Sequence, residues 1–247
     1  MTVNNIKIKE AFDFNVLKWD TEFFGVKSGK AVLNKELTTT EWNELLSKCK
    51  NYQFISIVNL FSEPKNAQTI GLNTSAFLAD TNIQFEKKVN GPKNIPGNVT
   101  IHQSLPRDER ILEMANFEYS KFIEDEKLAK RGGSQVYYEW ISNSFNNPEK
   151  YFALYRSENN YLNGFVLFSF NQNECVIELI AVSNTNKSKG IGTALFSTVE
   201  FEAERRGINV IQVGTQIRNL EAINFYHKVG CQQIGCHQVY HLWKEKS

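Results

Sequence analysis

The sequence predicts an α/β protein in which a mixed central sheet is flanked by helices, with a smaller α/β domain ahead of it. Apolar runs of strand length alternate with helical patterns along the chain of 247 residues. At residues 90–98 the segment NGPKNIPGN interrupts this alternation with turn-forming residues and no periodicity. We therefore expect an N-terminal domain at residues 1–92 and a second domain at residues 98–247.

The first domain is expected to alternate short strands and helices. Residues 24–33 (FGVKSGKAVL) and 53–61 (QFISIVNLF) read as strands. A helix that opens with threonine caps is predicted at residues 38–49, and a shorter helix at residues 64–72. Residues 74–89 are expected to be extended.

The second domain is expected to place three closely spaced strands between helices. Its first part is predicted to be an extended segment and two helices, at residues 99–105, 106–127 and 134–145. A meander of strands is predicted next, at residues 151–158, 164–170 and 175–182. The chain then alternates a helix, a strand, a helix and an extended tail, at residues 194–207, 208–215, 219–230 and 231–244.

The ends of the two halves have a similar order of elements. Each half reads as a strand, a polar loop, a short helix that ends near glycine, and an extended segment. The first half lacks the glycine turn and the tyrosine of the second. We infer that it is a degenerate copy of the C-terminal unit.

Composition excludes several classes of protein. Lys and Arg number 28 and Asp and Glu 27, so no net field points to nucleic acid or an anionic membrane as a partner. We expect a cytoplasmic protein, because the N-terminus has no signal-peptide pattern and no apolar run approaches membrane-spanning length.

The cysteines and histidines do not predict a metal site. Cys231, Cys236, His227 and His237 cluster in the sequence, but the paired spacing of metal ligands is missing. We expect small buried cysteines in a reducing compartment and no bound metal.

The glycine-rich segment KSKGIGT, at residues 187–193, lies between a predicted strand and a predicted helix. A helix N-terminus attracts anions, because its first backbone N–H groups have no partners within the helix. A phosphate-binding turn and an ordinary strand-to-helix turn both fit this pattern. The lysines precede the glycines and a third glycine is missing, so neither common nucleotide-binding motif is present.

The segment KSKGIG at residues 187–192 is followed by the segment NLEAINFYHKVGC, which begins at Asn219. Together these two motifs resemble the GNAT superfamily of acyl-CoA-dependent N-acetyltransferases. The segment KSKGIG is similar to the family pattern Q/R-x-x-G-x-G/A, with Lys187 in place of glutamine or arginine. The segment NLEAINFYHKVGC, which begins at Asn219, is similar to N-x-x-A-x-x-F-Y-x-x-x-G-F, with Cys231 replacing the final aromatic residue. The resemblance covers about residues 100–243 and implies a GNAT fold in the second domain.

The resemblance implies a site for acetyl-CoA or another short-chain acyl-CoA as cosubstrate, without a metal. The strand residues Ile180, Ala181 and Val182 would diverge from the neighbouring strand and pair with the pantetheine arm. The pyrophosphate would bind at the glycine turn, formed by Lys187, Ser188, Lys189, Gly190, Ile191, Gly192 and Thr193. Asn219 would contact the pantetheine, cap its own helix, or do both.

Two residues are candidates for acid–base catalysis. Tyr226 falls where the family often has a tyrosine beside the sulfur, so it would act as general acid on the leaving thiolate. Glu178 is a carboxylate within the apolar run VIELIAV and is a candidate base for the acceptor amine. An aromatic core residue and an outward-facing strand residue are the alternatives for Tyr226 and Glu178.

The segment LKWDTEFFG, at residues 17–25, resembles the opening of bacterial dTDP-amino-sugar N-acyltransferases of the dTDP-fucosamine acetyltransferase type. This resemblance implies a nucleotide-sugar acceptor whose 3- or 4-amino group is acylated for surface polysaccharide such as lipopolysaccharide or capsule. Trp19, Phe24, Tyr119 and Phe122 are candidate contacts to that substrate, and ordinary core packing is the alternative for each.

Other functions stay open at this stage. A protein or peptide N-acetyltransferase would use the same coenzyme, and a non-catalytic CoA-binding sensor would bind it without turnover. The acyl group is acetyl or a larger one such as 3-hydroxybutyryl. A homodimer fits the resembling proteins, in which paired C-terminal strands are common.

Overall fold

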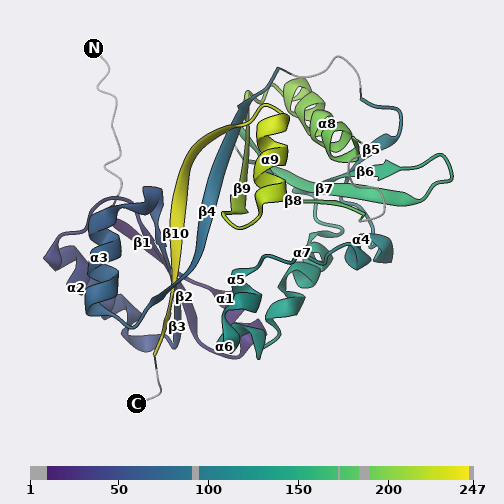
Figure 1. Ribbon diagram of the computed structural model, residues 1–247. Helices are drawn as coiled ribbons and strands as arrows, with labels where there is room; N and C mark the ends of the chain where they lie inside the picture. The colour runs from purple at the N-terminus through teal and green to yellow at the C-terminus, as the bar shows by residue number, and fades with distance from the viewer. Residues whose placement is uncertain (1–9, 91–94, 172, 184–189, 245–247) are drawn as a thin grey trace, which may run out of the picture. The chain divides into compact units, whose positions relative to one another are not determined.

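The computed structural model describes residues 10–90, 95–171, 173–183 and 190–244. They form two compact units (Figure 1), whose segments interleave along the chain. Unit 1 comprises Met1–Asn82, Lys121–Gly133 and Gly235–Ser247, and unit 2 comprises Ile83–Ser120 and Ser134–Ile234. These units group residues by packing, so the predicted domains at 1–92 and 98–247 stay a prediction.

Unit 1 is built on the strands β1 (Phe12–Val16), β2 (Ser28–Leu33) and β3 (Phe54–Asn59), with part of β10 (Gln232–Trp243). β1 pairs antiparallel with β2, β2 pairs parallel with β3, and β3 pairs antiparallel with β10. The helices are α1 (Lys18–Phe24), α2 (Thr39–Lys48), α3 (Pro64–Asn73), α5 (Lys121–Glu124) and α6 (Glu126–Ala129), with short 3₁₀ turns at Cys49–Asn51 and Leu60–Ser62. Its core includes Leu33, Trp42, Leu45, Ile57 and Ile70.

Unit 2 contains the predicted meander. β5 (Val99–Gln103), β6 (Lys150–Arg156), β7 (Leu162–Asn171) and β8 (Glu174–Val182) pair antiparallel in sequence, and β8 then pairs parallel with β9 (Val210–Gln216). β4 (Phe77–Lys88) lies beside β9 in the strand order. The helices are α4 (Glu109–Glu113), α7 (Val136–Ser144), α8 (Ile191–Arg205) and α9 (Leu220–Lys228), and a 3₁₀ turn at Gly133–Gln135 precedes α7.

Helices cover both faces of the unit 2 sheet. Ile111 of α4 and Ile141 of α7 share one core with Phe165 and Leu167 of β7. α8 packs against β6, β7 and β8, and a Cβ at Gly164 of β7 would meet Ile191 and Leu195 of α8 at 3.0 Å. Because successive strand residues point to opposite faces, Gly164 and Phe165 place α8 opposite α4 and α7. The predicted mixed sheet flanked by helices is confirmed.

Two predicted elements are wrong in their extent. Residues 106–127 do not form one helix but contribute to α4, α5 and α6. The side chain of Asp125 accepts from Lys127 N and Leu128 N, which accounts for the separate start of α6. The strand predicted from Phe24 begins at Ser28 instead. Phe24 ends α1, and Gly25 follows it in the left-handed conformation at φ 66°.

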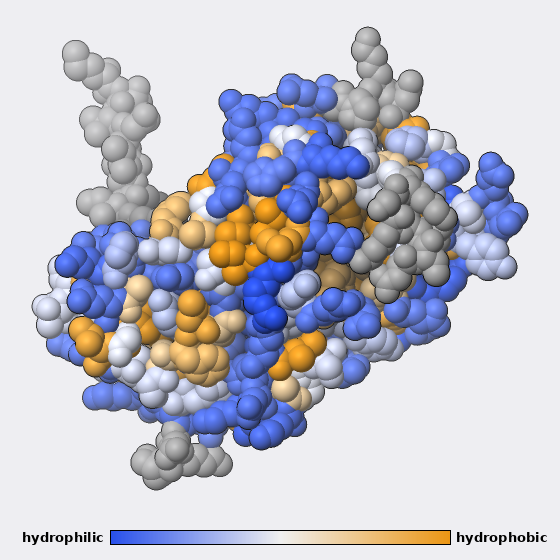
Figure 2. All heavy atoms as spheres, in the orientation of Figure 1, coloured by the Kyte–Doolittle hydropathy of each residue, from blue (hydrophilic) through white to orange (hydrophobic). Residues whose placement is uncertain are grey.

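Most of the surface in Figure 2 is hydrophilic, with apolar side chains gathered in a few places. The exposed large apolar residues include Phe61, Leu72, Phe77 and Leu78. Within the part of the chain that is described, no helix is both long and apolar enough to cross a membrane.

Candidate active site

The strands β8 and β9 are paired over only part of their length. Their parallel register runs from Glu174↔Val210 to Ile177↔Val213, although β8 continues to Val182 and β9 to Gln216. On its other edge β8 stays paired with β7 up to Val182. Ile180, Ala181 and Val182 therefore lie beyond the described β8–β9 ladder, where an extended ligand can pair with their backbone as an added strand.

A β-bulge precedes this segment and redirects Glu178. Phe168 pairs with Ile177 and Leu167 with Leu179, so Glu178 is the extra residue between two pairs. Bulges bend a strand and re-aim a side chain, and they are common beside active sites. The alternation that suggested an outward-facing Glu178 is broken at this position.

The Glu178 carboxylate is held by three donors within unit 2. Lys150 Nζ lies 2.5 Å and Ser169 Oγ 2.5 Å from Oε1, and the Trp140 indole N–H donates to Oε2 at 3.1 Å. The Glu178 side chain is 8% exposed. A buried carboxylate requires such partners, because an unpaired charge is strongly disfavoured in a protein interior.

The glycine turn leads directly into α8, but Lys187, Ser188 and Lys189 lie outside the described residues. Gly190 occupies the N-cap position of α8 with φ 78°, and a Cβ there would meet nothing within 4 Å. Among the described residues no side chain caps this helix, so its first N–H groups are available to an anion.

The other residues of the turn have different surroundings. Ile191 is buried, Gly192 is half-buried and Thr193 is exposed. A Cβ at Gly192 would lie 3.0 Å from the Phe225 ring of α9. Close packing of α8 against α9 thus accounts for Gly192, in addition to the access to phosphate that the motif suggests.

The helix α9 carries the other two predicted residues of this site. The Asn219 side chain caps α9 by accepting from Ala222 N at 3.0 Å. Tyr226 is 3% exposed, and its ring centroid lies 5.4 Å from that of Phe85. Burial, and to a lesser degree the neighbouring Cys231, raises the pKa of Tyr226, so the phenol is protonated at neutral pH and can donate a hydrogen bond.

Three of the four predicted substrate contacts come together in unit 1. Trp19 and Phe24 of α1 lie 6.4 Å apart between centroids, and Phe24 lies 6.2 Å from Phe122 of α5. Phe24 is 3% exposed and Trp19 is 37% exposed, so Trp19 offers more surface to a ligand. Tyr119 belongs to unit 2, where the Arg218 guanidinium lies 5.8 Å from its ring.

Three of the cysteines, Cys49, Cys175 and Cys231, are buried thiols. Burial raises the pKa of Cys49 and Cys231 to about 11 and that of Cys175 to about 12. A thiolate is the reactive form of cysteine, so these side chains are unreactive at neutral pH. In the described ranges no group of three or more His, Cys, Asp or Glu side chains is placed to hold a metal ion.

Sequence reasoning missed the partners of Glu178. Trp140 falls in a predicted helix, Lys150 immediately precedes a predicted strand and Ser169 lies within another, so no motif joins them. Only the pairing of β6 with β7 and β7 with β8 brings Lys150, Ser169 and Glu178 together.

Comparisons with known proteins bear on the family and the fold of this chain. Residues 109–231 match the model of the acetyltransferase (GNAT) family. The spore coat polysaccharide biosynthesis protein SpsD of Bacillus subtilis (strain 168) is 25% identical over 140 residues, which are 56% of this chain and 48% of that protein. The chain spans about half the length of the curated relatives it matches.

Solved structures share the fold at low sequence identity. A GCN5-related N-acetyltransferase from Sphaerobacter thermophilus matches with a TM-score of 0.60 at 12% identity, covering 94% of this chain and 76% of that one. A tandem GNAT protein from the clavulanic acid biosynthesis pathway matches with a TM-score of 0.56 at 12% identity, covering 88% and 76%. At this identity the likeness establishes the fold alone.

Proposed function

We propose that this chain, which belongs to the acetyltransferase (GNAT) family and matches its model over residues 109–231, transfers an acyl group from acyl-CoA to an amine. The proposed acceptor is the 3- or 4-amino group of a dTDP-amino-dideoxyhexose, and the product is an amido sugar for surface polysaccharide. Acetyl is the proposed acyl group, with 3-hydroxybutyryl as the larger candidate.

One observation carries the proposed chemistry: the β8–β9 ladder stops at Ile177, three residues before Ile180, in the strand that precedes α8, whose N-terminus no described side chain caps. The strand edge suits an extended pantetheine arm, and the helix end suits a pyrophosphate. The proposal that the acceptor is a sugar rests on two other observations. The segment at residues 17–25 resembles amino-sugar acyltransferases, and the similar SpsD is named for polysaccharide biosynthesis.

In the proposed reaction the amine nitrogen attacks the thioester carbonyl carbon, so a C–N bond forms and the C–S bond breaks. Glu178 takes a proton from the amine, and Tyr226 gives its phenolic proton to the departing sulfur. Transfer is direct within a ternary complex, because the buried cysteines are protonated and do not supply an acyl-carrying nucleophile.

The test incubates the protein with acetyl-CoA or 3-hydroxybutyryl-CoA and dTDP-3-amino or dTDP-4-amino sugars, and measures free thiol. Release that depends on the sugar supports the proposal. Release with peptide amines alone would identify a peptide N-acetyltransferase. Thermal stabilisation by CoA without release from any amine would identify a sensor.

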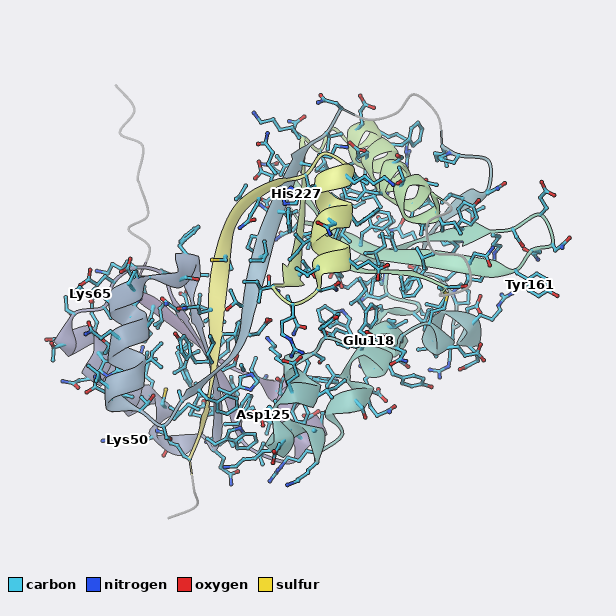
Figure 3. The ribbon with its side chains drawn as sticks, viewed as in Figure 1. Lys50, Lys65, Glu118, Asp125, Tyr161 and His227 are labelled. Carbon is cyan, nitrogen blue, oxygen red and sulfur yellow. The ribbon has the colours of Figure 1, made fainter. Side chains whose placement is uncertain are left out.

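Replacing Tyr226 tests the proposed general acid. Tyr226→Phe removes only the hydroxyl, so we expect kcat to fall by about 10²-fold or more while the Kd for CoA changes little. Tyr161→Phe is the matched control, because Tyr161 is 71% exposed near the turn between β6 and β7 (Figure 3). Equal turnover of the two variants would remove Tyr226 from the mechanism.

A further inference from the structure

The two oxygens of Glu178 have different surroundings. Oε1 accepts from both Lys150 and Ser169, so both of its lone-pair positions are used. Within the part of the chain that the structure describes, Oε2 accepts a hydrogen bond from Trp140. One lone-pair position of Oε2 is therefore available to a donor that comes from outside the chain.

Trp140 is held in place but remains open to solvent. The Trp140 residue is 40% exposed, whereas the side chain of Glu178 is 8% exposed. The indole is nearly parallel to the Tyr137 ring, with an interplanar angle of 11° and centroids 6.3 Å apart, and Phe117 packs on Tyr137 at 4.8 Å. The chain thus presents a fixed aromatic surface next to Glu178 Oε2.

We propose that Trp140 and Glu178 form the acceptor subsite for a primary amine carried on a saturated, hydroxylated six-membered ring. The amine donates an N–H to Glu178 Oε2, and the apolar face of the ring packs on the indole. The subsite lies in unit 2 and uses the bulged residue of β8, two positions before Ile180.

Lys150 and Ser169 are positioning residues for this subsite. The Lys150 ammonium supplies the opposite charge that a buried carboxylate needs, and both donors hold Oε1 so that Oε2 points to the indole side. When the amine attacks, its proton passes to Oε2, the new C–N bond forms and the C–S bond breaks. Neither Lys150 nor Ser169 exchanges a proton in this step.

This inference rests on the proposed function, and the experiment separates the two. Steady-state kinetics with the best dTDP-amino sugar and acetyl-CoA are measured for wild type, Trp140→Ala, Trp140→Phe, Lys150→Met and Lys150→Arg, with the Kd for CoA and the melting temperature of each. Lys65→Met is the control for loss of a lysine, because Lys65 lies on α3 in unit 1 (Figure 3).

We expect Trp140→Ala to raise the acceptor KM by roughly three- to tenfold, and Trp140→Phe to raise it less because a ring remains. Lys150→Met should lower kcat by about tenfold or more with little change in the Kd for CoA. Lys150→Arg should recover part of the lost kcat, because it keeps the positive charge. Lys65→Met should match wild type.

Outcomes that overturn the inference are distinct from those that overturn the function. If wild type releases thiol with amino sugars but Trp140→Ala leaves the acceptor KM unchanged, the subsite is wrong and the function stands. If Lys150→Met lowers the melting temperature and CoA affinity together and Lys150→Arg recovers neither, the ion pair is structural. If wild type releases no thiol with any amine, the proposed function fails.

Discussion

The side chains of Tyr226 and Glu178 both have little exposure to solvent. A neutral phenol can be buried among aromatic rings, whereas a buried carboxylate needs hydrogen-bond donors and an opposite charge. Tyr226 lies beside Phe85 and Phe225, and burial keeps its phenol protonated without further help. Glu178 needs Lys150 and two further donors because it carries charge. A sequence motif can locate such an acid, whereas the partners of a buried anion come from separate strands and helices.

Asp125 is a second buried carboxylate, in unit 1 (Figure 3), that sequence reasoning missed. It is 2% exposed and accepts four hydrogen bonds. Oδ1 accepts from Lys127 N and Leu128 N at the start of α6, and Oδ2 accepts from His241 Nδ1 at 2.7 Å and Trp243 Nε1 at 2.9 Å. Asp125 therefore fixes α6 to the end of β10.

The Asp125–His241 pair predicts that unit 1 is destabilised by acid. Burial is the main cause that lowers the pKa of His241 in the folded chain, and it outweighs the opposing effect of Asp125. For Asp125, burial raises the pKa, but the bonds from His241 and Trp243 together lower it. The unfolded chain therefore binds more protons, and stability falls as pH drops below about 6.5 and again below about 3.9.

Urea unfolding between pH 8 and pH 4 checks this expectation. Asp125→Asn should lower the free energy of unfolding at pH 7 by about 1.5–3 kcal/mol, because bonds to a charged acceptor are lost. His241→Gln should flatten the decline near pH 6, since no imidazole remains to take up a proton. A His241→Gln variant with the same decline as wild type would assign the acid sensitivity to other groups.

At the scale of elements, local pattern located most strands and helices but not their ends. The meander and both helices after it are confirmed. They could be predicted because each has a strong apolar period and is bounded by short turns. β1 and α1 were not predicted, and the predicted helix at 106–127 is three short helices, of which the last, α6, begins at the Asp125 cap. The capping bonds that end these helices depend on neighbours that sequence periodicity does not encode.

Replacing glycines in two helices by alanine tests how backbone conformation affects the stability of these elements. Gly71 lies within α3, and a Cβ there would meet nothing within 4 Å, so Gly71→Ala should stabilise the protein by about 0.5–1 kcal/mol. Gly190 also has room for a Cβ, but its φ of 78° disfavours alanine, so Gly190→Ala should destabilise by about 1–2 kcal/mol. Denaturant midpoints at constant m-value measure both changes.

The two alanine variants are expected to change stability in opposite directions. This difference separates the effect of backbone conformation from the effect of steric room for a Cβ. Both positions are open, so steric crowding cannot account for a difference between the two alanine variants. If Gly190→Ala were as stabilising as Gly71→Ala, the left-handed conformation at the start of α8 would not be a feature of the folded protein.

The whole molecule contains the same order of elements twice. The series β2, α2, β3, α3 and β4 repeats as β8, α8, β9, α9 and β10. The internal similarity inferred from the sequence therefore has a counterpart in the order of elements.

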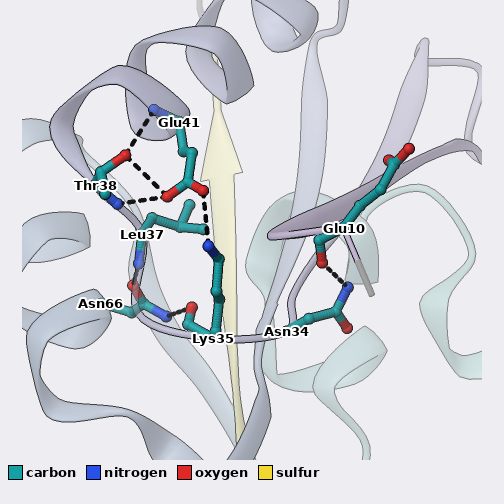
Figure 4. Close-up of polar contacts among 7 residues, drawn as sticks. All are labelled: Glu10, Asn34, Lys35, Leu37, Thr38, Glu41 and Asn66. Atoms are coloured by element: carbon teal, nitrogen blue, oxygen red, sulfur yellow. Dashed lines mark hydrogen bonds and ion pairs between the residues drawn. The ribbon is translucent and has the colours of Figure 1, made fainter. Parts of the chain in front are cut away.

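The first of these two series, called the first copy, lacks the features by which the second series, called the second copy, is proposed to bind a coenzyme. Its parallel strands pair over six positions, from Ser28↔Phe54 to Leu33↔Asn59, without the early end of the β8–β9 ladder. The N-terminus of α2 is closed by a capping box, in which Glu41 accepts from Thr38 N at 2.7 Å and Glu41 N donates to Thr38 Oγ1 (Figure 4). Ile70 holds the seventh position of α3, where α9 has Tyr226.

These differences predict one coenzyme per chain, bound by the second copy. In the first copy a carboxylate of the chain already occupies the helix end, where it is stabilised by the helix dipole and by Lys35 Nζ at 2.9 Å. Isothermal titration of the protein with CoA should therefore give a stoichiometry of one.

Gly190→Asp tests the assignment of that single site by placing a carboxylate at the N-cap of α8, as Glu41 does at α2. Asp tolerates positive φ and is a good N-cap, so the variant should fold, while its charge should weaken CoA binding by about tenfold or more. Gly190→Asn is the matched control, because it has the same shape and capping ability without the charge. A second equivalent of CoA, or unchanged binding by Gly190→Asp, would contradict the assignment, since the first copy would then have to bind the coenzyme despite its closed helix end.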